Sequence, residues 1–310
     1  MALTPVLVLR ALGLGDTLTG VPALRALRRH YSGRALVLAG PFAVSDWLRR
    51  QGLVDAVLPV GGLAGVPPGR VLGRHVAVNL HGRGPQSHRL LMAGQPDDLV
   101  AFDCPAAGFS GPAAWRPDEH EVRRWCRLVA ACGAPCDPED LRLPPPPGRT
   151  SAGQVVIHPG AADRARRWPA DRWAAVAREL GRSGARVVLT GSMAERGLCR
   201  SITVAADVPC ADLSGTLTLD DLAAVIASAG LVLSGDTGVA HLVTAYGVPS
   251  VTLFGPTPPS YWGPLIDPDL HTVLYAGTSA GDPHADRPDP ALLRITVEDV
   301  LSAMSARYPR

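Results

Sequence analysis

Short apolar runs alternate with longer amphipathic stretches along this chain, a pattern that is typical of βαβ units built around parallel sheets. In the first half it predicts strands at 6–9, 35–38, 56–60 and 76–80, and helices at 16–30 and 119–132. In the second half it predicts strands at 155–157, 186–189, 231–234 and 250–254, and helices at 171–183, 219–229, 239–246 and 297–307. The alternation therefore favours an α/β protein with two sheets.

Four consecutive prolines, Pro144 to Pro147, lie between the two halves. Such a run cannot continue a helix or a central strand and favours a stiff, extended connection. We therefore predict two Rossmann-like doubly wound domains, residues 1–150 and 151–285, facing each other across a cleft at the carboxyl ends of their strands. Residues 286–310 are expected to form a helical tail that packs back on the N-terminal domain.

The length and the net charge of the chain exclude some classes of function. The 310 residues are enough for two domains that each bury a core. The formal net charge of +2 argues against a nucleic-acid partner, because such proteins carry a strong basic excess. Every one of the 30 basic residues is arginine, so any cation that binds phosphate here is an arginine, whose planar fork can hold two oxygens.

The cysteines do not indicate a metal site. None of the six forms a CxxC pair and no histidine cluster completes a zinc spacing, so we expect reduced thiols and neither a metal nor another cofactor. The apolar run at the N-terminus is interrupted by Arg10 and matches neither a signal peptide nor a membrane span. The expected location is the cytoplasm.

The first candidate motif, Gly13-Leu14-Gly15-Asp16-Thr17, directly follows the first predicted strand. It is not a dinucleotide fingerprint, because Leu18 stands where the third glycine is needed, and the lysine of a P-loop is missing. Asp16 has two compatible interpretations. It is the N-cap of the helix, or it is a general base that takes a proton from an acceptor hydroxyl.

The second candidate segment runs from His158 to Pro169 and follows the first strand of the second half. Its three arginines include Arg166, which is either part of an ordinary solvated cluster or a clamp for a diphosphate. Trp168 is expected to serve packing, and Pro169 suits the first turn of a helix.

The third and most specific motif is Ser234-Gly235-Asp236-Thr237-Gly238, in which a buried strand runs through glycine into a helix. Free N–H groups at a helix start bind anions, Thr237 adds a hydroxyl, and Gly238 permits close approach. His241 lies one turn further on the same face. It either takes part in the site or is a core histidine of an apolar helix.

Two weaker signals complete the candidates. Glu195 follows a predicted strand, where its carboxylate could bind ribose hydroxyls, but Ser192-x-x-Glu195 also matches a capping box. The polar segment from Asn79 to Arg89 carries basic groups that would suit an anionic acceptor. Gly15, His81 and Arg83 are the candidates on this acceptor side.

In their order along the chain, these motifs resemble the ADP-heptose:lipopolysaccharide heptosyltransferase family, also called glycosyltransferase family nine. The resemblance spans nearly the whole chain. It is carried by Gly15-Asp16, by Arg166-x-Trp168-Pro169, by Leu213 to Leu219, by Asp236-Thr237-Gly238-x-x-His241 and by Phe254-Gly255-Pro256-Thr257.

This resemblance implies a GT-B fold whose N-terminal half binds the acceptor and whose C-terminal half binds the nucleotide-sugar, in an inverting transfer without a metal. Asp16 matches the family's base, and Arg166 stands in place of a lysine that contacts the donor phosphates. The remaining donor residues implied are Glu195 at the ribose, Leu217 near the adenine, and Asp236, Thr237, Gly238 and His241. Ala161 and Ala162 depart from the family, which carries hydroxyl-bearing residues there.

The predicted function is therefore glycosyl transfer from a nucleotide-diphosphate sugar to a glycan or lipid-linked acceptor. The protein is expected to be a monomer that transiently contacts the inner face of the membrane. Two alternatives remain open: a nucleotide-sugar epimerase of similar two-lobed fold, and a non-catalytic nucleotide-sugar-binding protein. Conversion of the donor without any acceptor would identify the epimerase.

Overall fold

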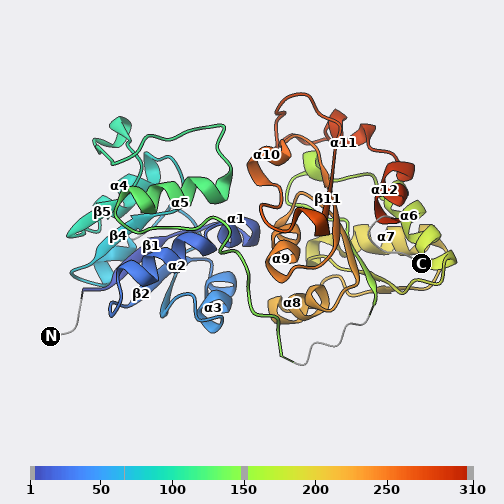
Figure 1. Cartoon of the computed structure of the whole chain (residues 1–310), viewed down its shortest axis with the longest axis horizontal. Helices are drawn as coiled ribbons and strands as arrows, with labels where there is room; N and C mark the ends of the chain where they lie inside the picture. Colours follow the sequence, from blue (N-terminus) through green and yellow to red (C-terminus); the bar gives the residue numbers. More distant parts are fainter. Residues whose placement is uncertain (1–3, 66, 148–152, 306–310) are drawn as a thin grey trace. The chain divides into compact units, whose positions relative to one another are not determined.

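The computed structural model describes residues 4–65, 67–147 and 153–305. It divides the chain into two compact units, Met1–Leu141 and Arg142–Arg310. Each unit is built on one parallel sheet (Figure 1). The first sheet has five strands and the second has six. The prediction of two Rossmann-like α/β domains is confirmed.

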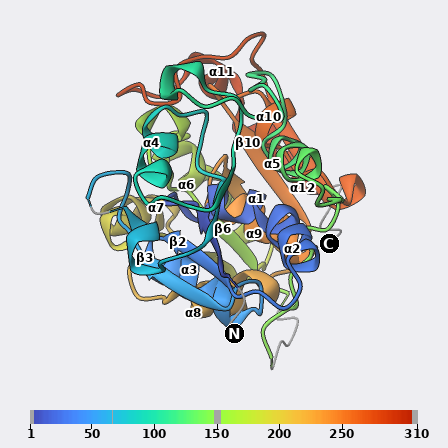
Figure 2. The ribbon, with the colours of Figure 1, turned by 90° about the vertical axis from the view of Figure 1, so that its left-hand side faces the viewer.

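The strands of the N-terminal unit lie in the order β3-β2-β1-β4-β5. They are β1 (Val6–Leu9), β2 (Leu36–Gly40), β3 (Ala56–Pro59), β4 (Val76–Asn79) and β5 (Asp98–Val100). The helices are α1 (Leu14–Thr19), α2 (Val21–His30), α3 (Phe42–Arg50), α4 (Gln86–Met92) and α5 (Glu121–Ala131), with 3₁₀ turns η1 (Pro68–Val71) and η2 (Pro105–Ala107). Helices α2 and α5 lie side by side on one face of the sheet, and α4 packs on the other (Figure 2).

The strands of the C-terminal unit lie in the order β11-β10-β9-β6-β7-β8. They are β6 (Val155–His158), β7 (Val187–Leu189), β8 (Cys210–Asp212), β9 (Leu231–Gly235), β10 (Ser250–Phe254) and β11 (His271–Tyr275). The helices are α6 (Ala170–Arg182), α7 (Arg196–Ala206), α8 (Leu219–Ala227), α9 (Gly238–Tyr246), α10 (Pro259–Trp262), α11 (Pro290–Arg294) and α12 (Val297–Ser305), with 3₁₀ turns η3 (Arg164–Arg166), η4 (Met193–Glu195) and η5 (Pro268–Leu270). Helices α8 and α9 pack together on one face, and α6, α7 and α12 on the other (Figure 1).

The helix predicted over 16–30 is two helices in the structure. Gly20 ends α1 and immediately precedes α2, and Pro22 lies in the first turn of α2. A proline there has no N–H to continue the hydrogen bonding of the preceding helix. The break matters because it places Asp16 in a short helix of its own.

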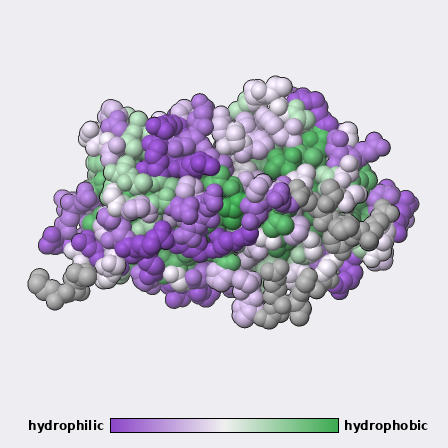
Figure 3. Space-filling view, viewed as in Figure 1, coloured by the Kyte–Doolittle hydropathy of each residue, from purple (hydrophilic) through white to green (hydrophobic). Residues whose placement is uncertain are grey.

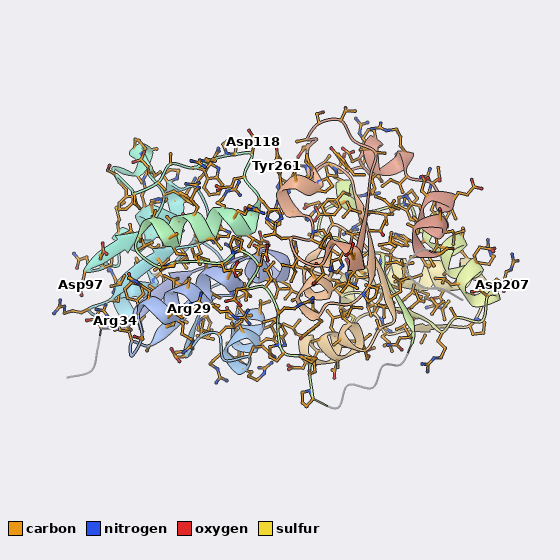
Figure 4. All side chains as sticks on the ribbon, in the orientation of Figure 1. Arg29, Arg34, Asp97, Asp118, Asp207 and Tyr261 are labelled. Carbon is orange, nitrogen blue, oxygen red and sulfur yellow. The ribbon has the colours of Figure 1, made fainter. Side chains whose placement is uncertain are left out.

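The pattern missed edge strands and several helices. Strands β5, β8 and β11 lie at the edges of their sheets and are only partly buried, so they lack the continuous apolar run that marks a central strand. Helix α7 was also not predicted. It ends at Ala206, and Asp207 follows it (Figure 4). Asp207 is in the left-handed conformation with φ of 54°, which aspartate tolerates better than most residues.

The boundary between the units lies earlier than predicted, at Leu141–Arg142. The N–H of Leu143 donates to the carbonyl oxygen of Ala245 at 3.0 Å. The guanidinium of Arg142 donates to the carbonyl oxygen of Thr244 at 3.1 Å. These bonds attach the start of the linker to the last turn of α9, and the predicted boundary at residue 150 falls outside the described residues.

The C-terminal segment also differs from the prediction. Residues 286–305 belong to the C-terminal unit, because Val300 and Met304 are buried in its core together with the side chains of α6 and β10. The indole N–H of Trp168 donates to the carbonyl oxygen of Ile295 at 3.0 Å, which ties the segment to the start of α6. Residues 306–310 lie outside the described residues.

Replacing Val300 with alanine should therefore destabilise the C-terminal unit. Its side chain is completely buried, and losing two methyl groups costs roughly 2 kcal/mol of unfolding free energy. Chemical denaturation measures the effect, and Val204→Ala is the control because Val204 is 73% exposed. Equal stabilities of the two variants would contradict the observed packing.

No helix within the described residues is long and apolar enough to cross a membrane. On the visible face of the N-terminal unit, hydrophilic residues predominate (Figure 3).

Candidate functional site

The first cluster of candidates lies where the strand order of the N-terminal sheet reverses, between β1 and β4. These strands pair in parallel, with Leu9 opposite Asn79, so the loops that follow them leave the sheet side by side. One loop leads to Asp16 and the other contains His81. Ligands of open α/β sheets bind at such a switch point, and this one belongs to the unit predicted to bind the acceptor.

Asp16 is not the N-cap of its helix. Gly13 takes that position without any side-chain bond, and Asp16 lies two residues inside α1. Its side chain is partly buried, and its carboxylate forms no hydrogen bond to a described residue. The first helical turn still favours a negative charge. The capping interpretation is therefore wrong, whereas the role of base stays a prediction.

His81 lies in the loop after β4 and has a defined ring orientation. Its Nδ1 accepts a hydrogen bond from the N–H of Ala11 at 3.2 Å, so the ring proton resides on Nε2. Burial lowers the pKa of His81, the charge of Arg10 lowers it further, and the negative charge of Asp16 acts in the opposite direction. At neutral pH the imidazole is consequently uncharged.

A buried polar network holds the loop that carries His81 and Arg83. The amide nitrogen of Asn79 donates to the hydroxyl of Ser87 at 3.0 Å, and the N–H of His81 donates to the side-chain oxygen of Asn79 at 3.1 Å. His88 Nε2 lies 2.8 Å from the carbonyl oxygen of Phe102. The side chain of Arg83 is exposed, so it is accessible to an anionic acceptor.

The pattern missed one residue of this cluster. Arg10 interrupts the apolar run at the N-terminus, yet it is completely buried and bonds to the main chain of Asp16. An arginine directly after an apolar strand was the one available signal, because a buried charge needs specific partners.

The second cluster lies in the C-terminal sheet, whose order corresponds to the 3-2-1-4-5-6 arrangement of dinucleotide-binding folds. The donor candidates follow the carboxyl ends of adjacent strands: Arg166 after β6, Glu195 after β7, Leu217 after β8, and Asp236, Thr237, Gly238 and His241 after β9. Parallel strands end at the same edge, so the structure brings these residues to one edge of the sheet, here called the donor edge. The strand order of this sheet reverses between β6 and β9, and this place is called the second switch point.

The turn after β9 leads into a helix start that no side chain caps. Thr237 is the N-cap of α9 in an extended conformation (φ −153°, ψ 170°), and its hydroxyl makes no capping bond. Asp236 is buried, and its N–H donates to the carbonyl oxygen of Leu253 at 3.1 Å. The Thr237 hydroxyl and the first N–H groups of α9 can therefore serve an anion.

His241 is not a core histidine. Its side chain is only partly buried, and its ring lies 5.8 Å from that of Trp262 in an edge-to-face arrangement. It lies one turn beyond Thr237 on α9, the helix that begins at the donor edge. Its predicted contact with a phosphate or sugar stays a prediction.

Arg166 connects the two sides of the second switch point. Its guanidinium pairs with Asp163 at 2.8 Å and points toward the carbonyl oxygen of Asp236 at 3.5 Å. Arg166 therefore lies beside the turn between β9 and α9 and is not part of a purely solvated surface cluster. Trp168 is 2% exposed and packs edge-to-face on Trp173 at 4.9 Å, so its predicted packing role is confirmed.

Asp163 should compete with a bound diphosphate for Arg166. The hydrogen bond from Arg166 lowers the pKa of Asp163 against the opposing effect of burial, and His284 lowers it further, so the carboxylate is ionised and repels an anion. We expect Asp163→Asn to tighten ADP binding about fivefold, equivalent to ~1 kcal/mol. Calorimetry at fixed salt checks this, with the exposed Asp171→Asn as control. A loss of affinity would mean that Asp163 instead holds Arg166 in position.

Glu195 does form the capping box. Its Oε2 accepts from the N–H and the hydroxyl of Ser192 at 2.7 and 2.8 Å. Its Oε1 lies so close to Gly160 that a β-carbon at that position would collide with it, so the carboxylate also reaches the loop after β6. The N–H of Gly215 donates to the carbonyl oxygen of Gly191 at 2.9 Å, which holds the partly exposed Leu217 near this turn. Capping is confirmed, and the ribose and adenine roles stay predictions.

Within residues 4–65, 67–147 and 153–305, no three His, Cys, Asp or Glu side chains form a group that could hold a metal ion.

The chain is similar to known glycosyltransferases. The family model described as glycosyltransferase family 9 (heptosyltransferase) matches residues 116–282, which include every donor candidate and leave Asp16 outside. Lipopolysaccharide heptosyltransferase 2 of Escherichia coli K12 is 31% identical over 149 residues, covering 46% of this chain and 42% of that protein. The chain thus aligns with less than half the length of the first curated relatives.

Solved structures share the fold. The family 9 glycosyltransferase of Veillonella parvula has a TM-score of 0.82 at 20% identity, over 99% of this chain and 98% of that one. The iron-containing dodecameric glycosyltransferase TibC of enterotoxigenic E. coli has a TM-score of 0.65 at 16% identity, over 98% and 76%. Since the family model matches more than half of the sequence, the chain belongs to glycosyltransferase family 9.

Proposed function

We propose that this chain is an inverting glycosyltransferase that moves a heptose-like sugar from an ADP-linked donor to a hydroxyl of a cell-envelope glycan. The observation that carries the proposal is the second switch point, where Arg166 and the N-terminus of α9 flank the edge at which such sheets bind nucleotides. Family membership supports glycosyl transfer. The name of the E. coli relative supports heptose and lipopolysaccharide as the substrate classes.

On the donor side, the diphosphate would accept hydrogen bonds from the first N–H groups of α9 and from the Thr237 hydroxyl, with Arg166 supplying positive charge. Negative charge develops on the diphosphate as its bond to the sugar breaks, and these groups stabilise that charge. His241 would orient a phosphate or sugar hydroxyl. Glu195 would bind the ribose through Oε1, and Leu217 would contact the adenine.

On the acceptor side, Asp16 would take the proton from the acceptor hydroxyl. The oxygen then attacks the anomeric carbon from the face opposite the leaving diphosphate, which inverts the configuration. Gly15 would permit close approach of the acceptor, and His81 and Arg83 would bind its polar or anionic groups. A lipid-linked acceptor would bring the chain, as a monomer, to the inner face of the membrane.

The transfer is proposed to need no metal, because Arg166 and α9 supply the positive charge that a metal would otherwise provide. Incubation with a chelator, followed by removal of the chelate, should leave the rate of transfer unchanged. The check is the rate measured with and without added Mg²⁺, Mn²⁺ or Fe²⁺ after this treatment. A rate that is lost and then restored by one of these ions would contradict the proposal.

The proposal is tested by a thermal-shift screen of ADP-, GDP-, UDP- and dTDP-sugars, since a ligand that binds the native state raises the melting temperature. ADP-heptose should give the largest shift. Mass spectrometry of acceptor glycans then detects the added sugar, with donor alone as the control for epimerisation. Stabilisation by a reduced nicotinamide cofactor alone would overturn the proposal.

A further inference from the structure

Arg10 is a completely buried arginine directly after β1. Taking a guanidinium out of water is expensive, and replacing a buried ionic group by apolar residues is often neutral or stabilising. Burial lowers the pKa of Arg10, and the negative charges of Glu121 and Asp16 counteract this. The stability of the folded protein alone therefore does not explain why a charged residue is buried after β1.

The guanidinium of Arg10 holds both sides of the first switch point. Its Nε donates to the main-chain carbonyl oxygen of Asp16 at 2.6 Å, and one terminal nitrogen donates to the hydroxyl of Thr19 at 2.9 Å. The other terminal nitrogen donates to the carbonyl oxygen of Leu80, the residue before His81. One side chain thus ties α1 to the end of β4, using the rigid fork that only arginine has.

Helix α5 holds Arg10 itself in place. Glu121 lies 3.7 Å from the guanidinium, and the ring of Trp125 lies 4.8 Å from its central carbon. The indole N–H of Trp125 in turn donates to Glu121 at 2.9 Å. The guanidinium therefore has little freedom to move.

We propose that Arg10 is a positioning residue, which fixes the carboxylate of Asp16 and the imidazole of His81 relative to each other at the first switch point. Its kinetic part rests on the proposed function, because Asp16 must act as the base for the placement to matter. On α1 and the loop after β4, the described partners of the Arg10 guanidinium are the main-chain oxygens of Asp16 and Leu80 and the Thr19 hydroxyl, so Arg10 acts through these two segments and not on a substrate.

A second buried arginine provides a matched control. Arg124 is also buried, pairs with the same Glu121 and lies 4.2 Å from the ring of Trp115. Its other bonds go to the carbonyl oxygens of Arg116, Pro117 and Glu119, at 3.0, 3.1 and 2.9 Å. It supports the start of α5, and these bonds reach neither α1 nor the loop after β4.

The test compares Arg10→Lys and Arg10→Met with Arg124→Lys and Arg124→Met in the full chain. Hydrogen exchange is followed at the amides of Thr17 and Gly20, which are bonded within α1 to the carbonyl oxygens of Gly13 and Thr17. All four variants should melt at a lower temperature, because each changes one partner of the buried Glu121 and leaves that carboxylate in place. Only the Arg10 variants should exchange these amides about tenfold faster, because α1 has lost its anchor.

Kinetics supply the second readout. A misplacement of about 1 Å can cost about 100-fold in rate, so kcat should fall by that order in Arg10→Lys with the KM for the donor unchanged. The Arg124 variants should keep the kcat of the wild type. If the Arg10 variants do not fold, Thr19→Val removes one acceptor of the guanidinium and should give smaller changes of the same sign.

Unchanged exchange at Thr17 and Gly20 in the Arg10 or Thr19 variants overturns the inference whatever the activity. Faster exchange with a wild-type kcat also overturns it, because the placement would then be irrelevant to the reaction. A wild-type chain that transfers no sugar contradicts the proposed function instead, and the exchange comparison still decides whether Arg10 positions α1.

Discussion

Asp16→Asn should reduce kcat for sugar transfer by roughly 100- to 10,000-fold, the contribution of a well-placed general base. An amide of nearly the same shape cannot accept the proton from the acceptor hydroxyl. Donor binding should be unchanged, because the donor candidates belong to the C-terminal unit. The measurement is kcat by detection of the released nucleoside diphosphate, together with donor affinity by calorimetry.

A matched control exists in the same unit. Asp46 is a partly buried carboxylate on α3 that pairs with Arg49 at 2.8 Å, so Asp46→Asn changes a similar group without touching the switch point. It should keep the kcat of the wild type. If Asp16→Asn and Asp46→Asn had the same kcat, Asp16 would not be the base, and another group such as His81 would have to be tested.

Gly238→Pro should weaken binding of ADP by about 10- to 100-fold, since a hydrogen bond to a charged group contributes roughly 1.5–3 kcal/mol. Gly238 is the first residue of α9, a position where proline fits, and Thr237 before it is already in the extended conformation that proline requires of its neighbour. The helix should therefore form normally. What is lost is one N–H aimed at the predicted diphosphate.

Gly238→Ala separates the lost N–H from added bulk. Gly238→Ala introduces a β-carbon but keeps the main-chain N–H. It should therefore recover most of the roughly 10- to 100-fold loss of ADP affinity that is expected for Gly238→Pro. Calorimetry gives the affinities, and thermal melting checks that both variants are folded. Equal affinities for the two variants would mean that this N–H does not contact the diphosphate.

Most of the central elements were predictable because their signals are local. Strands β1, β6, β9 and β10 are completely or nearly completely buried runs, and a strand covered on both faces is apolar at nearly every position. The edge strands β5 (DLV) and β8 (CAD) were not predictable, because they are short, partly exposed and interrupted by aspartate, whereas the edge strand β3 (AVLP) keeps an apolar run. The C-terminal helix α12 was predicted as a helix, but its packing against α6 and β10 was not.

The turn between β9 and α9 shows how much of a site can be predicted from sequence alone. A strand, a glycine, Thr237 and a helix follow one another directly, so the backbone geometry at the start of α9 is encoded within a few residues. The capping box of Glu195 is likewise local. That Arg166 lies beside Asp236, 70 residues away, depends on the pairing of β6 with β9, which only the fold provides.

The alternating apolar pattern and the residues around Thr237 thus determined by themselves that this chain is an α/β protein with two sheets and that a helix starts directly after β9, since both signals come from neighbours in the chain. Only the tertiary structure decided that α12 belongs to the C-terminal core and that Arg10 joins the loops after β1 and β4. These features depend on contacts between distant segments. No local pattern specifies which buried surface or which carbonyl oxygen a side chain will meet.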